Sequence, residues 1–308
     1  MVTNEDNYIR FDWAMKRLLR NKANYVVLEG FLSSLLGKKF KIHRFLESES
    51  NQEDEDDKYN RVDILAESEN EQLCIIEVQN SREQTYFHRM LYGVSKAITE
   101  YIGLGKPYEA VRKVYSINIV YFELGQGKDY VYHGKTEFVG EHEPHDTLKL
   151  SIRQNEKFFG IKDDKLELRK SPGDLFPEYY ILRVNDFDKV ATTPLDEWIE
   201  FLKTGSISSK ATAAGLPEAR ERLRVDSLSQ KDKQAYYRHL EAVRHMKSLF
   251  DTSRDEGYQD GLTEGRIEGR AEGRVEGRAE GRAEGEKEKA KEIALKLLAL
   301  NTPIDIIF

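Results

Sequence analysis

The sequence predicts an α/β protein whose first half follows the element order αβββαβ and whose C-terminal end is a helical extension. Three observations lead to this prediction. Two short apolar segments, 61–66 and 73–79, flank a polar turn and have the composition of paired β-strands. Segments with apolar residues at helical spacing precede and follow this hairpin. From residue 257 to residue 285, a glycine recurs at every fourth position in a charged repeat unlike the rest of the chain.

The elements around the hairpin follow in order. An amphipathic helix is predicted at about 12–36, and a strand follows around 40–45. After the hairpin, a helix is predicted at about 82–104, and its apolar face consists of Phe87, Leu91, Val94, Ile98 and Tyr101. Segment 114–124 is dense in Val, Ile and Tyr, as expected of a strand covered on both faces. A hairpin turn is predicted at 123–129, where two glycines occur.

Further elements are predicted in the second half of the chain. Segment 176–184 has the composition of a strand, and 194–202 forms a short helix with Pro194 in its first turn. Segment 232–250 is amphipathic and predicts another helix. None of these segments carries a recognisable catalytic set, so we expect the chemistry in the first half.

Two carboxylates on the predicted hairpin form a candidate metal site. An unpaired charge on such apolar strands costs several kcal/mol unless another group compensates for it. Side chains alternate along a strand, so Glu77 and Gln79 share a face. A turn centred on Asn70 places Asp63 directly across from Glu77, where one divalent cation could bridge them. Oxygen ligands favour Mg²⁺ or Mn²⁺.

Several short motifs resemble a known family. Phe11-Asp12 followed by Met15-Lys16-Arg17, then RVDILA, IIEVQ and the segment 87–92, resemble the Rpn branch of the PD-(D/E)XK nuclease superfamily, often labelled PD-(D/E)XK nuclease family transposases. The resemblance covers roughly residues 8–250. It implies a PD-(D/E)XK nuclease-like core and a Mg²⁺-dependent DNA endonuclease that promotes recombination or is linked to mobile elements. Asp63 and Glu77 would be its metal ligands.

The chain departs from this family at one position, because Gln79 stands where the family's usual lysine lies. A neutral amide offers no positive charge to position water or stabilise a phosphate, so catalysis would depend more on the metal. Lys16 and Arg89 are candidates for the missing cation, and Glu29 could add a further carboxylate.

Two alternatives stay open at this point. Asp63 could only cap a strand end, with Glu77 and Gln79 on the exposed face of an edge strand. The whole chain could also be a catalytically weakened relative that binds nucleic acid or a partner protein, a function that Gln79 and the acidic net charge favour slightly.

Composition sets further expectations. The net charge of -7 argues against a uniformly basic DNA-coating surface, but much of the acidity lies in segment 47–57. Basic residues that could contact phosphates cluster in three groups: Lys16, Arg17, Arg20 and Lys22; Lys38, Lys39 and Lys41; and Arg220, Arg222 and Arg224. The single cysteine, Cys74, and the lack of a signal peptide or a long apolar stretch predict a cytoplasmic protein without a membrane span.

We expect three regions, namely a nuclease-like core at 1–155, an accessory α/β and helical region at 156–250, and a repeat helix with its tail at 251–308. The x-E-G-R repeat places glutamates next to glutamates and arginines next to arginines at i,i+4, and each glycine weakens an isolated helix by about 0.8 to 1 kcal/mol. A partner helix would stabilise such a segment, which predicts a homo-oligomer. The alternative is a disordered charged tether.

Overall fold

The protein is built around one mixed β-sheet, and the computed structural model describes residues 8–46, 63–102, 107–161 and 170–300. The six strands lie in the order β1-β2-β3-β4-β6-β5. Strands β3 and β4 are parallel, as are β4 and β6, and the other neighbours are antiparallel. Sequence residues 61–62 of the predicted first hairpin strand and the acidic segment 47–57 lie outside the described residues.

The first predicted helix is two helices. Helix α1 covers Phe11–Arg17, and α2 covers Tyr25–Leu36, so the prediction of one continuous helix over 12–36 is wrong. Two asparagines between them explain the break. The side chain of Asn21 accepts a hydrogen bond from the backbone of Ala23, and the side chain of Asn24 donates to the Leu18 carbonyl. These bonds compete with the helical ladder, as short polar side chains commonly do.

The predicted hairpin is present. After β1 (Ile42–Leu46), strands β2 (Ile64–Ser68) and β3 (Leu73–Gln79) pair in antiparallel fashion. Ile64 lies opposite Ile76, which is the register of a turn centred on Asn70. Glu71 in this turn has a positive φ of 58°.

Helix α3 (Tyr86–Ile102) and strand β4 (Val114–Val120) complete the predicted αβββαβ order. The predicted apolar face of α3 is confirmed at Val94, Ile98 and Tyr101, but Phe87 and Leu91 are exposed and Tyr86 and Met90 are buried instead. The prediction is therefore wrong only in the first two turns of the helix.

The rest of the sheet comes from the second half of the chain. Among the described strands, β5 (Val131–Gly134) pairs only with β6 (Glu178–Arg183), and β6 lies between β4 and β5. The segment at 123–129 therefore connects strands that are not neighbours, and the predicted hairpin there is wrong. The remaining helices before the last are α4 (Ile152–Phe159), α5 (Pro194–Thr204) and α6 (Leu216–Arg222). As predicted, α5 begins with Pro194, after a Thr193 cap.

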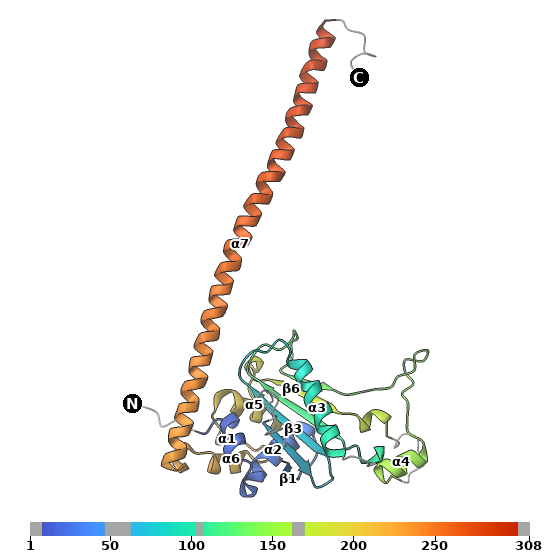
Figure 1. Cartoon of the computed structure of the whole chain (residues 1–308), viewed down its shortest axis with the longest axis vertical. Helices are drawn as coiled ribbons and strands as arrows, with labels where there is room; N and C mark the ends of the chain where they lie inside the picture. The colour runs from blue at the N-terminus through green and yellow to red at the C-terminus, as the bar shows by residue number, and fades with distance from the viewer. Residues whose placement is uncertain (1–7, 47–62, 103–106, 162–169, 301–308) are drawn as a thin grey trace. The chain divides into compact units, whose positions relative to one another are not determined.

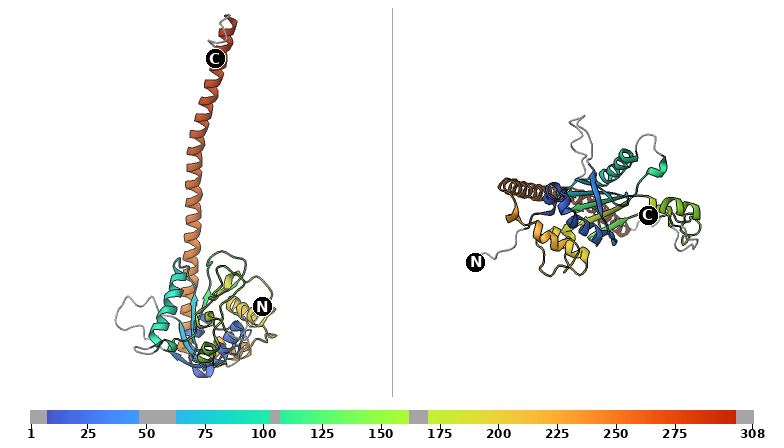
Figure 2. Two further views of the ribbon diagram at one scale, coloured as in Figure 1. Left: turned by 90° about the vertical axis from the view of Figure 1, so that its right-hand side faces the viewer. Right: turned by 90° about the horizontal axis from the view of Figure 1, so that it is seen from below.

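Helices cover both faces of the sheet, as Figures 1 and 2 show. The larger core packs α1, α2 and α5 against one face, with Phe11, Phe31 and Trp198 in edge-to-face contact. Helix α3 covers the other face over a smaller core that includes Leu73, Ile75 and Val94. Short 3₁₀ turns occur at Lys22–Asn24, Tyr108–Ala110, Pro172–Leu175, Val184–Asp186 and Val225–Ser227.

The chain divides into two compact units, Met1–Val243 and Arg244–Phe308. The last helix, α7 (Gln230–Ala299), begins in the first unit and continues as one helix through the glycine repeat (Figure 1). The structure confirms the predicted helical extension, although 232–250 and the repeat belong to one element. Among the described helices, none is both long and apolar enough to cross a membrane.

Candidate active site

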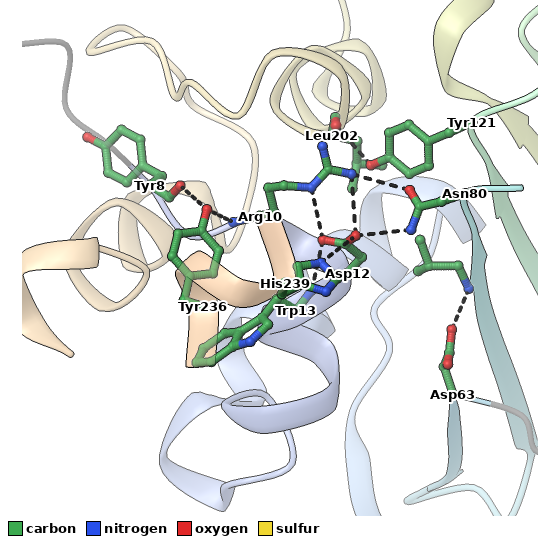
Figure 3. A network of polar contacts seen from close by, with 11 residues as sticks. Tyr8, Arg10, Asp12, Trp13, Asp63, Asn80, Tyr121, Leu202, Tyr236 and His239 are labelled. Carbon is green, nitrogen blue, oxygen red and sulfur yellow. Dashed lines mark hydrogen bonds and ion pairs between the residues drawn. The ribbon is translucent and has the colours of Figure 1, made fainter. Parts of the chain in front are cut away.

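Asp63, one residue before the start of β2, is placed opposite Glu77 of β3. The observed register, extended by one residue beyond Ile64 and Ile76, pairs these two positions. Residues alternate between the two faces, so Glu77 shares the α3 face with Leu73 and Ile75. The Asp63 carboxylate is fixed at the strand end, where its Oδ2 accepts a 2.8 Å hydrogen bond from the Val78 amide (Figure 3).

Glu77 is a buried carboxylate with polar neighbours. Its side chain lies under α3, and the residue is only 6% exposed. The Tyr86 hydroxyl lies 3.4 Å from Oε2, and Arg89 Nε lies 3.6 Å from the same oxygen. Burial raises the pKa of Glu77 to about 7, Arg89 opposes this shift, and nearby Asp63 adds to it. The carboxylate therefore lies in a dry environment with one arginine beside it, and a bound cation would further stabilise its charged form.

A polar pair on β4 extends the site in a way that the sequence analysis missed. Asn118 lies directly beside Glu77 in the parallel pairing of β3 and β4, and Ser116 is two residues before it on the same face. Both are almost fully buried. The available signal was the presence of two polar residues at alternating positions in an otherwise apolar strand.

The other predicted catalytic residues fall into different places. Arg89 lies beside Glu77 and donates to Glu83 Oε2 at 3.2 Å. Gln79, at the end of β3, is half-buried, and its amide donates to Ser81 Oγ at 3.2 Å. Lys16 lies in α1, but its side chain is outside the described part of the structure. The structure thus gathers Asp63, Glu77 and Arg89 in one site.

Glu29 belongs elsewhere, and the suggestion that it joins the site is wrong. Its carboxylate binds Lys41 Nζ and accepts a 3.0 Å hydrogen bond from the Ile42 amide. Ile42 pairs with Ser68, five residues along β2 from Asp63, which corresponds to roughly 17 Å of strand. Glu29 therefore anchors the start of β1 to α2.

A second buried carboxylate, Asp12, holds the segment that follows β3. Figure 3 shows Asp12 surrounded by Arg10, Asn80 and His239. Asp12 Oδ2 lies 3.1 Å from Asn80 Nδ2 and 3.2 Å from His239 Nε2, and Oδ1 lies 3.2 Å from Arg10 Nε. Although burial opposes it, bonding to His239 and Arg10 holds the pKa of Asp12 well below its usual range. Asp12 therefore holds the side chain of Asn80, the residue that directly follows Gln79 at the end of β3.

Most of the predicted phosphate-binding cations have protein partners. Lys41 pairs with Glu29, Arg224 pairs with Asp226 at 2.8 Å, and Arg222 donates to Asn24 at 3.2 Å. Arg20 is exposed and donates to the Asp63 carbonyl at 2.7 Å. Arg20 therefore brings a positive charge to the edge of the carboxylate site, a placement that sequence spacing did not reveal.

The donor set fits a divalent cation bound mainly by two carboxylates. Within the described ranges, no group of three or more His, Cys, Asp or Glu side chains gathers as a metal site. Asp63 and Glu77 nevertheless offer oxygens from opposite positions on one face, and their mutual repulsion is a feature that a hard cation such as Mg²⁺ would offset. Water and phosphate oxygens commonly complete the coordination of Mg²⁺.

The αβββαβ frame and its paired carboxylates define a nuclease-like α/β domain. Residues 9–158 match the family model described as PD-(D/E)XK nuclease family transposase, and this part of the chain belongs to that family. The matched segment runs from just before α1 into α4, so β6 and α5 lie beyond it. Comparison with curated proteins and with solved structures gave no match.

Proposed function

We propose that the protein is a divalent-metal-dependent DNA endonuclease that hydrolyses phosphodiester bonds and acts in recombination or with mobile elements. One observation carries this proposal, namely that Asp63 and the desolvated Glu77 lie opposite each other on one face of the sheet. The nuclease family match over 9–158 supports the same reading.

Asp63 and Glu77 would hold Mg²⁺ or Mn²⁺. Such an ion, when bound, activates water and offsets charge on the phosphate oxygens. The Val78 amide orients Asp63, while Tyr86 and Arg89 restrain Glu77. Arg89 and the exposed Arg20 supply positive charge for the nucleic-acid phosphates. Gln79 contributes an amide that can orient water or a phosphate oxygen but adds no charge.

Plasmid cleavage tests this function. The purified protein is incubated with supercoiled plasmid in Mg²⁺, in Mn²⁺ and in EDTA, and nicking is followed with time. We expect cleavage only with metal, and loss of cleavage in Glu77→Gln. Glu69→Gln is the matched control, because Glu69 is an exposed carboxylate in the β2–β3 turn. Undiminished cleavage by a folded Glu77→Gln variant would contradict the proposal.

A binding protein is the second candidate, and Gln79 favours it. Its neutral amide is engaged with Ser81 and leaves the usual lysine position without charge. Such a protein would bind DNA equally well in EDTA and would cleave nothing. Calorimetric titration with Mn²⁺ separates the two functions, since a relative that has lost its metal site releases no binding heat.

We also propose that α7 pairs with α7 of a second copy. The eight glycines from Gly257 to Gly285 have open space where a side chain would lie. In the repeat, each glycine from Gly265 to Gly281 follows a glutamate and precedes an arginine, so these charges flank the glycine stripe on opposite sides. Two parallel helices that meet on this stripe place glutamates against arginines, whereas antiparallel helices place like charges together. Charge complementarity therefore favours a parallel pair.

A further inference from the structure

Four polar side chains form a connected row beneath α3. They are Ser116 and Asn118 of β4, Tyr86 at the first turn of α3, and Glu77 of β3. All four are buried, and Tyr86 is fully inaccessible to solvent. Buried polar groups of this kind are kept only when hydrogen bonds satisfy them, so the direction of each bond matters.

The amide of Asn118 has a fixed orientation. Its Nδ2 lies 3.2 Å from the Tyr180 carbonyl and 3.0 Å from Ser116 Oγ. A backbone carbonyl can only accept, so the amide nitrogen must lie on that side. Asn118 Oδ1 consequently faces Tyr86, whose hydroxyl lies 3.2 Å away.

The Tyr86 hydroxyl lies between two acceptor oxygens and, with one proton, donates to one of them at a time. It lies 3.2 Å from Asn118 Oδ1 and 3.4 Å from Glu77 Oε2. The tyrosine ring is fixed by apolar neighbours, including an edge-to-face contact with Phe122 at 5.8 Å between centroids. The hydroxyl therefore has a defined position that does not depend on Glu77 itself.

Both contacts to the Glu77 carboxylate are made to the same oxygen. Tyr86 and Arg89 approach Oε2, and this arrangement turns Oε2 toward the interior of the site. A carboxylate has a soft terminal torsion, so neighbours of this kind decide which oxygen is presented outward.

We propose that Tyr86 is a positioning residue that donates to Glu77 Oε2 and leaves Oε1 to a divalent cation beside Asp63, while Asn118 Oδ1 competes with Glu77 for the same hydroxyl proton. This inference rests on the proposed metal-dependent function. It connects the β4 pair to the metal site through the Tyr86 hydroxyl. Partners of metal-ligating carboxylates typically change metal affinity by ten- to a hundredfold when they are removed.

The test is Mn²⁺ affinity measured by calorimetry on the full chain. Tyr86→Phe removes only the hydroxyl oxygen and keeps the ring, and we expect it to weaken Mn²⁺ binding about tenfold. Tyr121→Phe is the matched control. Tyr121 donates to the Leu202 carbonyl at 2.9 Å and packs with the larger core. Removing its hydroxyl should therefore leave Mn²⁺ affinity unchanged.

A second variant separates positioning from folding. Asn118→Leu is close in size and removes the competing acceptor, so Tyr86 donates to Glu77 alone and we expect Mn²⁺ to bind at least as tightly as in the parent. The double variant should bind Mn²⁺ no more weakly than Tyr86→Phe alone, because Asn118 acts through Tyr86. Weaker Mn²⁺ binding by Asn118→Leu than by the parent, or by the double variant than by Tyr86→Phe alone, would overturn this inference, whether or not Tyr86→Phe lowers the unfolding midpoint.

The outcomes also distinguish this inference from the proposed function. If Tyr86→Phe binds Mn²⁺ as tightly as the parent while Asp63→Asn abolishes binding, the metal site stands and the positioning role is wrong. If the parent protein binds no Mn²⁺ at all, the proposed function fails and the inference fails with it.

Discussion

His239 and Asp12, 227 residues apart in sequence, are joined by a 3.2 Å contact between imidazole and carboxylate. This contact ties the first turns of α7 to α1. One turn earlier in α7, the Tyr236 hydroxyl accepts a 3.1 Å hydrogen bond from the Arg10 backbone amide. Because Asp12 also binds Asn80, the same group secures the segment that leaves the carboxylate strand.

Removing Asp12 should destabilise the fold strongly. Asp12→Ala leaves the buried edge of Arg10 and the amide of Asn80 without their acceptor, which we expect to cost about 3 kcal/mol of unfolding free energy. Urea unfolding at pH 7 measures this. Asp226→Ala, which breaks an exposed ion pair, is the control and should leave stability unchanged. Equal stability of both variants would mean that the Asp12 network contributes little.

The lowered pKa of Asp12 also predicts that its contribution to stability is lost at acidic pH. Its pKa is lowered in the folded state, so its contribution is present above the ordinary pKa of 3.8 and is lost as pH falls below that value. The stability difference between the parent and Asp12→Ala should therefore shrink at acidic pH.

Glu77 predicts the opposite pH dependence. Its folded pKa of about 7 lies above the ordinary 4.5, so the folded state holds a proton that the unfolded chain has already released. The contribution of Glu77 to the free energy of unfolding is fully present below about pH 4.5. It is lost as pH rises through 7, and the loss amounts to about 3 kcal/mol. To measure this contribution, the unfolding free energies of the parent and of Glu77→Gln are compared at pH 5 and at pH 8. A constant difference across that range would show that Glu77 titrates normally.

Local sequence patterns were sufficient for the αβββαβ order and for the register of the hairpin. Alternation along β2 and β3, with a turn of fixed length, leaves one pairing that places Asp63 opposite Glu77. Helical spacing located α3 and α5. These features depend on neighbours in sequence, which is why sequence analysis could predict them.

Two kinds of feature could not be predicted in this way, namely individual side-chain hydrogen bonds and contacts between distant segments. The break between α1 and α2 depends on side-chain bonds of Asn21 and Asn24 that compete with the helix. The insertion of β6 beside β4 depends on pairing across more than sixty residues. The link from Asn118 through Tyr86 to Glu77 joins three separate elements and has no spacing signature.

Gln79→Lys should be tolerated and should maintain or raise cleavage. Gln79 is half-buried, so a longer cationic side chain can extend toward solvent, and the lost bond to Ser81 is a minor cost. A cation at this place would face the scissile phosphate. The measurement is the initial nicking rate in Mg²⁺ beside the unfolding midpoint. An unfolded variant would show that Gln79 points into the packed interior, and a folded variant with lower activity would argue against the predicted catalytic register.

Gly→Ala substitutions in α7 should give opposite results for the two states of the repeat. As an isolated helix, α7 would gain about 0.8 to 1 kcal/mol from each alanine at Gly265, Gly269, Gly273 and Gly277, where a side chain meets nothing. In a parallel pair that meets on the glycines, the added methyl groups would force the helices apart and weaken association. Far-ultraviolet circular dichroism measures the gain of helix, and light scattering measures the loss of the paired species. Raising salt should also weaken the pair, because Glu to Arg contacts are screened.

Cross-linking then tests the direction of the pair. The only native cysteine, Cys74, is buried, so a cysteine introduced at Gly261 or at Gly281 reports on α7 alone. In a parallel pair each variant by itself forms a disulfide-linked dimer, because like positions meet. In an antiparallel pair, cross-links form mainly when the two variants are mixed. A full-length protein that is monomeric at low and high salt, and that forms no cross-link in either variant, would show that the repeat does not pair.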